Sequence, residues 1–164
     1  EAYELLAGSL AAQPEQPELL YESALLAEKL GRHEAMEASL RKLIRLKPEH
    51  AHAYNALGYS FAERNQRLEE AEQLVLKALQ LSPDDPFIID SMGWVLYRKG
   101  DNQGALAHLQ RAFSIRPDPE IAAHLGEVLW ALGRRDEAKR IWQEAAKAHP
   151  GNEVLAEVIK RFAP

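Results

Sequence analysis

The chain has 164 residues, of which 46% are hydrophobic and 27% charged, and it carries a formal net charge of -5 and no cysteine. The acidic balance argues against a nucleic-acid partner, because nonspecific binding to phosphates needs a basic face. Without cysteine the chain has no disulfide, thiolate metal site or thiol nucleophile, and no apolar stretch approaches the roughly 20 residues that span a bilayer. Ala, Leu, Glu, Lys, Arg and Gln dominate and Thr is absent, which favours helices over strands and predicts an all-α protein.

Prolines recur every 33 to 35 residues along the chain, at Pro14, Pro48, Pro83, Pro117 and Pro150. Each follows an apolar run, such as LIRLKP or ALQLSP, that reads as the end of a helix. A residue without a backbone N–H does least harm just past a helix end. The spacing therefore predicts a repeated structural unit of about 34 residues.

Two further columns of small residues keep the same period. The first reads as the turn between two helices, since Gly and Asn reach the left-handed conformation that stops a helix; it comprises Gly31, Asn65, Gly100 and Gly133. The second reads as the point where two helices of a unit cross closely; it comprises Gly58, Gly93 and Gly126. We expect Gly93→Leu to overpack this crossing and Gly93→Ala to be tolerated.

These columns predict ten helices, taken in chain order. They span residues 1–12, 17–30, 34–47, 50–64, 68–81, 85–99, 102–115, 118–132, 135–148 and 152–162. Pro17, Pro86 and Pro119 lie in first helical turns, and Asp85, Asp118 and Asn152 are predicted to cap exposed amides.

The columns match the tetratricopeptide repeat, and the chain resembles that family over nearly its whole length. The unit FIIDSMGWVLYRKGDNQGALAHLQRAFSIRP is the clearest example. Departures are Met36 and Leu43 at places usually held by small residues, and an extra residue between Asn65 and Ala71.

The resemblance implies an all-α, right-handed α-solenoid of antiparallel helix pairs, the tetratricopeptide superhelix, with a concave and a convex side. We expect one continuous array over 1–164, without a linker. Its predicted parts are the second helix of a truncated repeat at 1–14, full repeats at 17–48, 50–83, 85–117 and 118–150, and a capping helix at 152–162.

In such arrays the first helix of each pair lines the concave groove, and the helical period identifies the inward side chains. The predicted partner-binding residues are Tyr21, Asn55, Tyr59, Asp90, Trp94, Tyr97, Arg98, Glu127 and Trp130. We expect Tyr59, Trp94 and Tyr97 to form an exposed aromatic strip, with Asp90 and Glu127 among the charges at its rim. The alternative is that these aromatic side chains wedge between helix pairs and are buried.

Nothing in the sequence predicts catalysis or a cofactor. There is no nucleophile elbow, HExxH motif or phosphate-binding glycine loop. The six histidines lack metal-ligand spacing on a common helical face, and Asp84 and Asp85 lie where each unit has a turn and a cap. Family members that clamp a terminal carboxylate carry Lys, Arg and Asn in the groove, and only Asn55 fits that pattern here. We therefore expect a non-enzymatic scaffold that binds a peptide segment of another protein.

Residues 90–146 also look like the C-terminal repeats of large proteobacterial tetratricopeptide proteins. Some of these are outer-membrane lipoproteins that deliver substrates to a periplasmic carboxyl-terminal processing protease. This resemblance implies a periplasmic adaptor whose parent protein is tethered to the outer membrane, with a cytoplasmic location as the alternative. Two other functions stay open: a self-assembly module of a larger complex, and the substrate-selecting region of an enzyme whose catalytic domain lies elsewhere.

Overall fold

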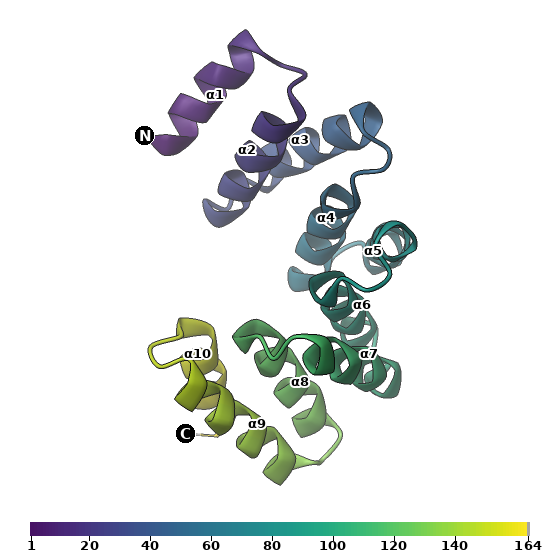
Figure 1. Ribbon diagram of the computed structural model, residues 1–164, viewed down its shortest axis with the longest axis vertical. Coiled ribbons are helices and arrows are strands. Elements are labelled where there is room, and N and C mark those ends of the chain that lie inside the picture. Colours follow the sequence, from purple (N-terminus) through teal and green to yellow (C-terminus); the bar gives the residue numbers. More distant parts are fainter. Residues whose placement is uncertain (164) are drawn as a thin grey trace. The chain divides into compact units, whose positions relative to one another are not determined.

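A computed structural model describes residues 1–163, which form ten α-helices and no strand (Figure 1). The helices are α1 (Ala2–Ala12), α2 (Pro17–Lys29), α3 (His33–Leu46), α4 (Ala51–Glu63), α5 (Leu68–Leu81), α6 (Pro86–Arg98), α7 (Asn102–Ile115), α8 (Pro119–Ala131), α9 (Arg135–Ala148) and α10 (Glu153–Phe162). Every predicted helix is present, with ends that differ by one residue at most. The all-α helical-repeat fold is confirmed.

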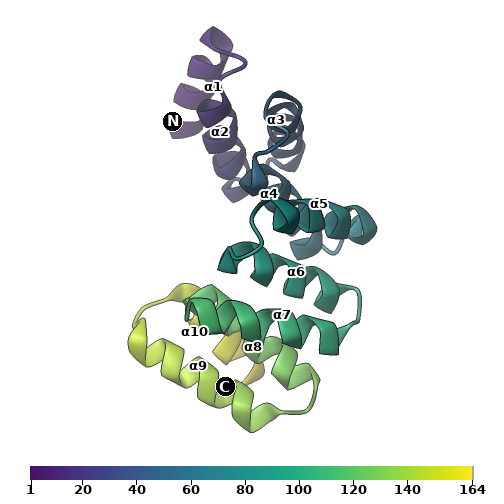
Figure 2. The same ribbon diagram turned by 45° about the vertical axis from the view of Figure 1, so that its right-hand side comes forward.

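Contacts divide the chain into two compact units, Glu1–Pro83 with α1 to α5 and Asp84–Pro164 with α6 to α10. In the first unit α2 packs on α3 and α4 packs on α5, as the repeat predicts, and α1 lies against α2. In the second unit α6 pairs with α7 and α8 with α9, while α10 packs on both α8 and α9 (Figure 2). The expectation of one continuous array over both units stays a prediction.

The turns between paired helices have the predicted left-handed backbone. Gly31, Asn65, Gly100 and Gly133 have φ angles of 70°, 54°, 92° and 80°. Arg67 also has a positive φ, 48°, and directly precedes α5. This second left-handed residue lies in the segment between Asn65 and Ala71 that has one residue more than the other units. The change of backbone direction at Arg67 accommodates the extra residue.

Predicted caps hold the starts of three helices. The Asp85 carboxylate accepts hydrogen bonds from the amides of Phe87 and Ile88, at 2.9 and 3.3 Å. Asp118 and Asn152 accept from the backbone amides of Glu120 and Leu155 at the starts of α8 and α10. Each bond satisfies an amide that has no partner within its own helix.

Crossing glycines leave no room for a methyl group. A Cβ atom at Gly93 would lie 2.7 Å from Leu109 Cγ, and one at Gly58 would lie 2.7 Å from Val75 Cγ2. At Gly126 it would overlap the indole of Trp142. The crossing assignment agrees with these distances, whereas the expected tolerance of Gly93→Ala does not, because helix propensity cannot offset a clash with a fully buried leucine.

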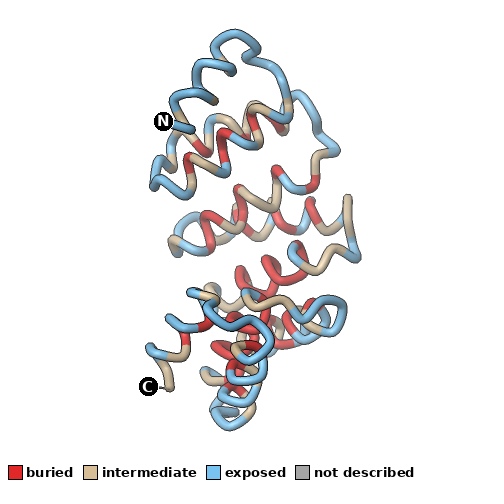
Figure 3. The backbone as a smooth tube through the Cα atoms, turned by 60° about the vertical axis from the view of Figure 1, so that its left-hand side comes forward, coloured by how far each residue is buried: buried red, intermediate tan, exposed pale blue. Residues whose placement is uncertain are grey.

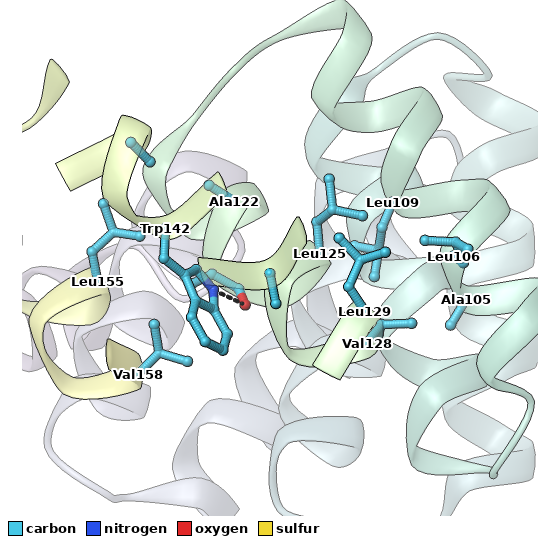
Figure 4. Packing of buried hydrophobic residues seen from close by; sticks show 13 residues of the cluster. Ala105, Leu106, Leu109, Ala122, Leu125, Val128, Leu129, Trp142, Leu155 and Val158 are labelled. Carbon is cyan, nitrogen blue, oxygen red and sulfur yellow. Dashed lines mark hydrogen bonds between the residues drawn. The ribbon is translucent and has the colours of Figure 1, made fainter. Parts of the chain in front are cut away.

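The cores are mainly apolar and follow the inner faces of the paired helices (Figure 3). In the first unit Met36 and Leu43 are completely buried, so larger residues at these places fill the interior. In the second unit Trp142 lies among Leu155, Val158 and α8, and donates a hydrogen bond of 3.3 Å to the carbonyl of Ala123 (Figure 4). By contrast, α1 buries no residue, and Leu5 is 69% exposed.

Candidate partner-binding site

First helices of the N-terminal unit, α2 and α4, keep several predicted residues accessible. Tyr21 and Tyr59 are half-buried, and Leu25, one turn after Tyr21, is 40% exposed. The Tyr21 ring lies beside the ring of His50, with centroids 5.2 Å apart. Asn55 is half-buried, and its Oδ1 atom is enclosed without a hydrogen-bond partner in the described structure.

A small apolar cavity of about 120 Å³ opens between α2, α3 and α4. Leu25 and Tyr59 form part of its wall, together with Met36, Leu40 and Ala56. Met36 and Leu40 belong to the buried core, so the floor of the cavity is core surface. This arrangement suits an aliphatic side chain better than water, because the wall offers few hydrogen-bond partners.

Glu28 fixes the polar edge of this cavity. Ser60 Oγ on α4 donates to both carboxylate oxygens of Glu28, at 3.0 and 2.9 Å. His33 Nδ1 lies 3.3 Å from Oε2 of the same carboxylate, and Arg64 donates to Ser60 Oγ at 3.3 Å. These bonds tie α2 to α4 and hold the cavity wall in place.

In the C-terminal unit the equivalent places are closed. Trp94 is only 4% exposed and stacks on His124, with ring centroids 4.1 Å apart and planes 22° apart. His124 Nδ1 lies 2.9 and 3.0 Å from the two carboxylate oxygens of Asp90, which is 5% exposed. The expected exposure of Trp94 and the rim position of Asp90 are therefore wrong, because a histidine of the next first helix covers both side chains.

Glu127 is likewise an interior group rather than a rim charge. It is 9% exposed, accepts a hydrogen bond of 3.4 Å from the hydroxyl of Tyr97, and pairs with Arg161 of α10 at 2.7 Å. Burial raises the pKa of Glu127 above its ordinary value. Nearby positive charges oppose this shift, and Arg161 has the largest opposing effect. Burial and the Glu127 carboxylate also raise the pKa of Tyr97.

Two other predicted residues are partly accessible. Arg98 is half-buried, and its guanidinium lies 5.3 Å from the centre of the Trp94 ring. Trp130 is half-buried and belongs to an aromatic cluster with Trp142 and Phe162, with each centroid 5.9 Å away. Trp130 thus contributes to the contact between α8, α9 and α10, and only the remaining part of its ring is accessible to a partner.

Sequence reasoning missed His124 and Arg161, which cover the predicted residues. A signal for both was present in the repeat itself. Asp90 and His124 are 34 residues apart, as are Glu127 and Arg161. A separation of one repeat places two residues at matched positions of successive first helices, so polar pairs at this spacing are candidates for direct contact.

Among residues 1–163, no group of acidic, histidine or cysteine side chains has an arrangement suited to a metal ion. Nor does any helix in this described part combine the length and apolar character needed to cross a membrane. Asp90 with His124, and Glu127 with Arg161, instead form hydrogen bonds between helices.

Comparisons with known proteins agree with this architecture. Models of the tetratricopeptide repeat match residues 17–50, 37–86 and 96–160, and together they span most of the chain. A TPR repeat-containing protein of Pseudomonas aeruginosa is 47% identical over 127 residues, which cover 77% of this chain and 22% of that protein. The chain thus corresponds to about a fifth of the length of this relative.

Solved structures show the same fold. A thermophilic TPR protein of Thermus thermophilus is 26% identical, with a TM-score of 0.85 over 99% of this chain and 87% of that one. MamA of Desulfovibrio magneticus is 16% identical, with a TM-score of 0.72 over 93% of this chain and 86% of its own. YrrB, a TPR protein with an unusual peptide-binding site, is 22% identical, with a TM-score of 0.67 over 97% of this chain and 84% of its own.

Tetratricopeptide arrays are protein-interaction scaffolds whose stacked helices present extended binding surfaces. The repeat matches, the paired helices and the left-handed turns all agree on this architecture. The chain belongs to the tetratricopeptide repeat family.

Proposed function

We propose that this chain is a non-enzymatic adaptor that holds a peptide segment of another protein on the first helices of its N-terminal unit. The observation that carries the proposal is the contrast between matched places in the two units. Tyr21, Leu25 and Tyr59 stay accessible around an apolar cavity, whereas Asp90 and Trp94 are covered. An accessible apolar surface beside a preformed cavity is typical of a peptide-binding site.

Site-specific photocrosslinking tests this proposal. A photoreactive amino acid replaces Leu25 in one variant and Leu76 in the control, since Leu76 has a similar exposure of 41% but lies on α5. Each variant is irradiated in a proteobacterial envelope extract, and the crosslinked segments are identified by mass spectrometry. The adaptor function predicts one recurrent segment at Leu25 that is absent at Leu76, and identical products from both variants would contradict it.

We further propose that the parent protein is tethered to the outer membrane in the periplasm and delivers substrates to a carboxyl-terminal processing protease. Support comes from the resemblance of residues 90–146 to repeats of such lipoproteins. Reconstituted proteolysis with the full-length parent is the test. Addition of the parent should accelerate cleavage of the delivered substrate, and an unchanged rate would remove the protease from the proposal.

Self-assembly is a second candidate, favoured by α1, which buries no residue and leaves Leu5 largely exposed. Light scattering at two concentrations separates the two functions. A self-assembly module should form oligomers that persist in a Leu25→Glu variant and dissociate in a Leu5→Glu variant. A monomer at both concentrations would eliminate this candidate.

A further inference from the structure

The surface of α2 carries two neighbouring depressions of different chemistry. One is the apolar cavity of about 120 Å³ that Leu25 and Tyr59 border. The other, of about 400 Å³, lies beside Tyr21 and is lined by three carboxylates, Glu18, Glu22 and Glu49, against one lysine, Lys47. Both belong to the N-terminal unit. Tyr21, which lines the second depression, and Leu25, which lines the first, lie one turn apart on the same face of α2.

The apolar cavity has the size and wall of a pocket for a single side chain. Its volume is somewhat below the roughly 150 Å³ at which an engineered apolar cavity accepts benzene. Core residues Met36 and Leu40 form the floor, and Leu25 remains 40% exposed at the mouth. Insertion of a branched aliphatic or methionine side chain would remove apolar surface from water on both partners.

The second depression has an uncompensated negative charge. Neither Glu18 nor Glu22 forms an ion pair within residues 1–163, and Glu18 lies in the first turn of α2. Across the two first helices, the charged side chains are Glu18, Glu22, Glu28, Glu63 and Lys29, an acidic excess. A partner with a positive charge at this place is attracted, and a negative one is repelled.

Spacing links the two depressions to one extended ligand. Tyr21 and Leu25 are one helical turn apart, about 6 Å along the axis. In an extended peptide, residues i and i+2 point to the same side and lie about 7 Å apart. A peptide that runs along α2 with an aliphatic side chain in the cavity therefore places its residue two positions away beside Tyr21, at the edge of the acidic depression.

We propose that this site binds an extended peptide in which a Leu, Ile or Met side chain lies two positions from a Lys or Arg. This inference rests on the proposed adaptor function and specifies its partner by charge and shape. The aliphatic side chain fills the cavity beside Leu25 and Tyr59. The cation lies near Glu18 and Glu22, and its contribution weakens as salt increases.

Peptide selection on the intact chain tests the inference. A phage-displayed library of short random peptides is selected on the chain and, in parallel, on an unrelated helical protein. Enriched peptides are then synthesised with a fluorescent label, and their affinities are measured by anisotropy. We expect the enriched peptides to share an aliphatic residue two positions from a basic one.

Matched variants locate the bound peptide. Leu25→Glu introduces a charge at the cavity mouth and should weaken binding at least about tenfold, whereas Leu76→Glu, at equal exposure, should change it little. Glu18→Lys combined with Glu22→Lys should weaken binding and reverse its salt dependence, because salt then screens a repulsion, with the exposed Glu34→Lys as the charge control. Circular dichroism confirms that each variant is folded.

The outcomes separate the two proposals. Enriched peptides without the aliphatic and basic pair overturn this inference and leave the adaptor function standing. Equal effects of Leu25→Glu and Leu76→Glu contradict both proposals, because the peptide then does not bind on α2. If no peptide is enriched over the unrelated protein, the adaptor function fails as well.

Discussion

Gly126 lies where α8 crosses α9, against the indole of the fully buried Trp142. The indole also donates a hydrogen bond to Ala123, so it cannot move aside freely. We predict that Gly126→Ala lowers the free energy of unfolding by about 1 to 3 kcal/mol, the usual cost of overpacking. Urea denaturation measures this change.

The matched control is Gly8→Ala in α1, where a methyl group would meet no atom within 4 Å. Here the better helix propensity of Ala should stabilise the helix by about 0.5 to 1 kcal/mol. Equal urea midpoints for the two variants would mean that α8 and α9 do not cross at Gly126.

Trp94 is the residue for which exposure decides the expected phenotype. At 4% exposure it is a packing residue that stacks on His124. Trp94→Ala should therefore cost about 3 to 5 kcal/mol and lower the thermal midpoint by roughly 10 °C. Tyr59→Ala, at a half-buried place on α4, should cost clearly less. A wild-type melting temperature for Trp94→Ala would restore the exposed-strip interpretation.

At the scale of whole elements, adjacent aspartates before α6 have different roles. Asp85 accepts hydrogen bonds from two amides of the first turn, while Asp84 is 87% exposed and pairs with Arg111 at 2.8 Å. We predict a loss of about 1 kcal/mol for Asp85→Ala, typical of a lost cap. Asp84→Ala should cost much less, since exposed ion pairs contribute little. Chemical denaturation of both variants is the measurement, and the reverse order would refute the capping assignment.

Helices α3 and α5 are joined by a network of two arginines and two glutamates. Arg41 donates to Glu37 and Glu70 at 2.8 and 2.6 Å, and Arg67 approaches the same two carboxylates at 2.9 and 2.6 Å. The hydrogen bond from Arg41 is the main reason why the pKa of Glu70 is lowered from its ordinary value of 4.5. The ionised carboxylate is thus favoured in the folded state.

A carboxyl group whose pKa is lower in the folded state stabilises the fold at pH values above its pKa in the unfolded state. This stabilisation is lost as the pH falls through the pKa in the folded state. Glu70→Gln should therefore reduce the free energy of unfolding by about 1 kcal/mol or less at neutral pH, since the pair is partly exposed. The difference from wild type should shrink as pH falls below 4.5, the ordinary value, and at high salt. A constant difference from neutral to acidic pH would show that Glu70 acts only through packing.

On the scale of the molecule, stability in a repeat array is a sum of local terms, because each helix pair contacts only its neighbours. Gly126→Ala should therefore accelerate amide exchange most in α8, α9 and α10, the elements that share the Trp142 core. Exchange in α2 and α3 should change little. Hydrogen-exchange mass spectrometry resolves these segments, and a uniform acceleration over the chain would indicate one global unfolding unit instead.

The helices and their ends could be read from the sequence because their determinants are local. Gly31 and Gly133 reach the left-handed backbone without a steric penalty, and Asp118 and Asn152 find their amides within three residues. The crossing glycines were also recognisable, since a small residue at a fixed period indicates close approach of two helices. What a methyl group would meet there depends on the facing side chain, and the period does not specify it.

The accessibility of the binding residues depended on contacts between repeats. The helical period places Tyr59 and Trp94 at the same position of their units, yet Tyr59 borders an open cavity and Trp94 is buried under His124. Whether a first-helix side chain is covered depends on the residue about 34 positions away, on the helix that packs beside it. Local propensity and periodicity set the helices and their inward faces, whereas side-chain pairing across helices sets which parts of those faces remain free to bind a partner.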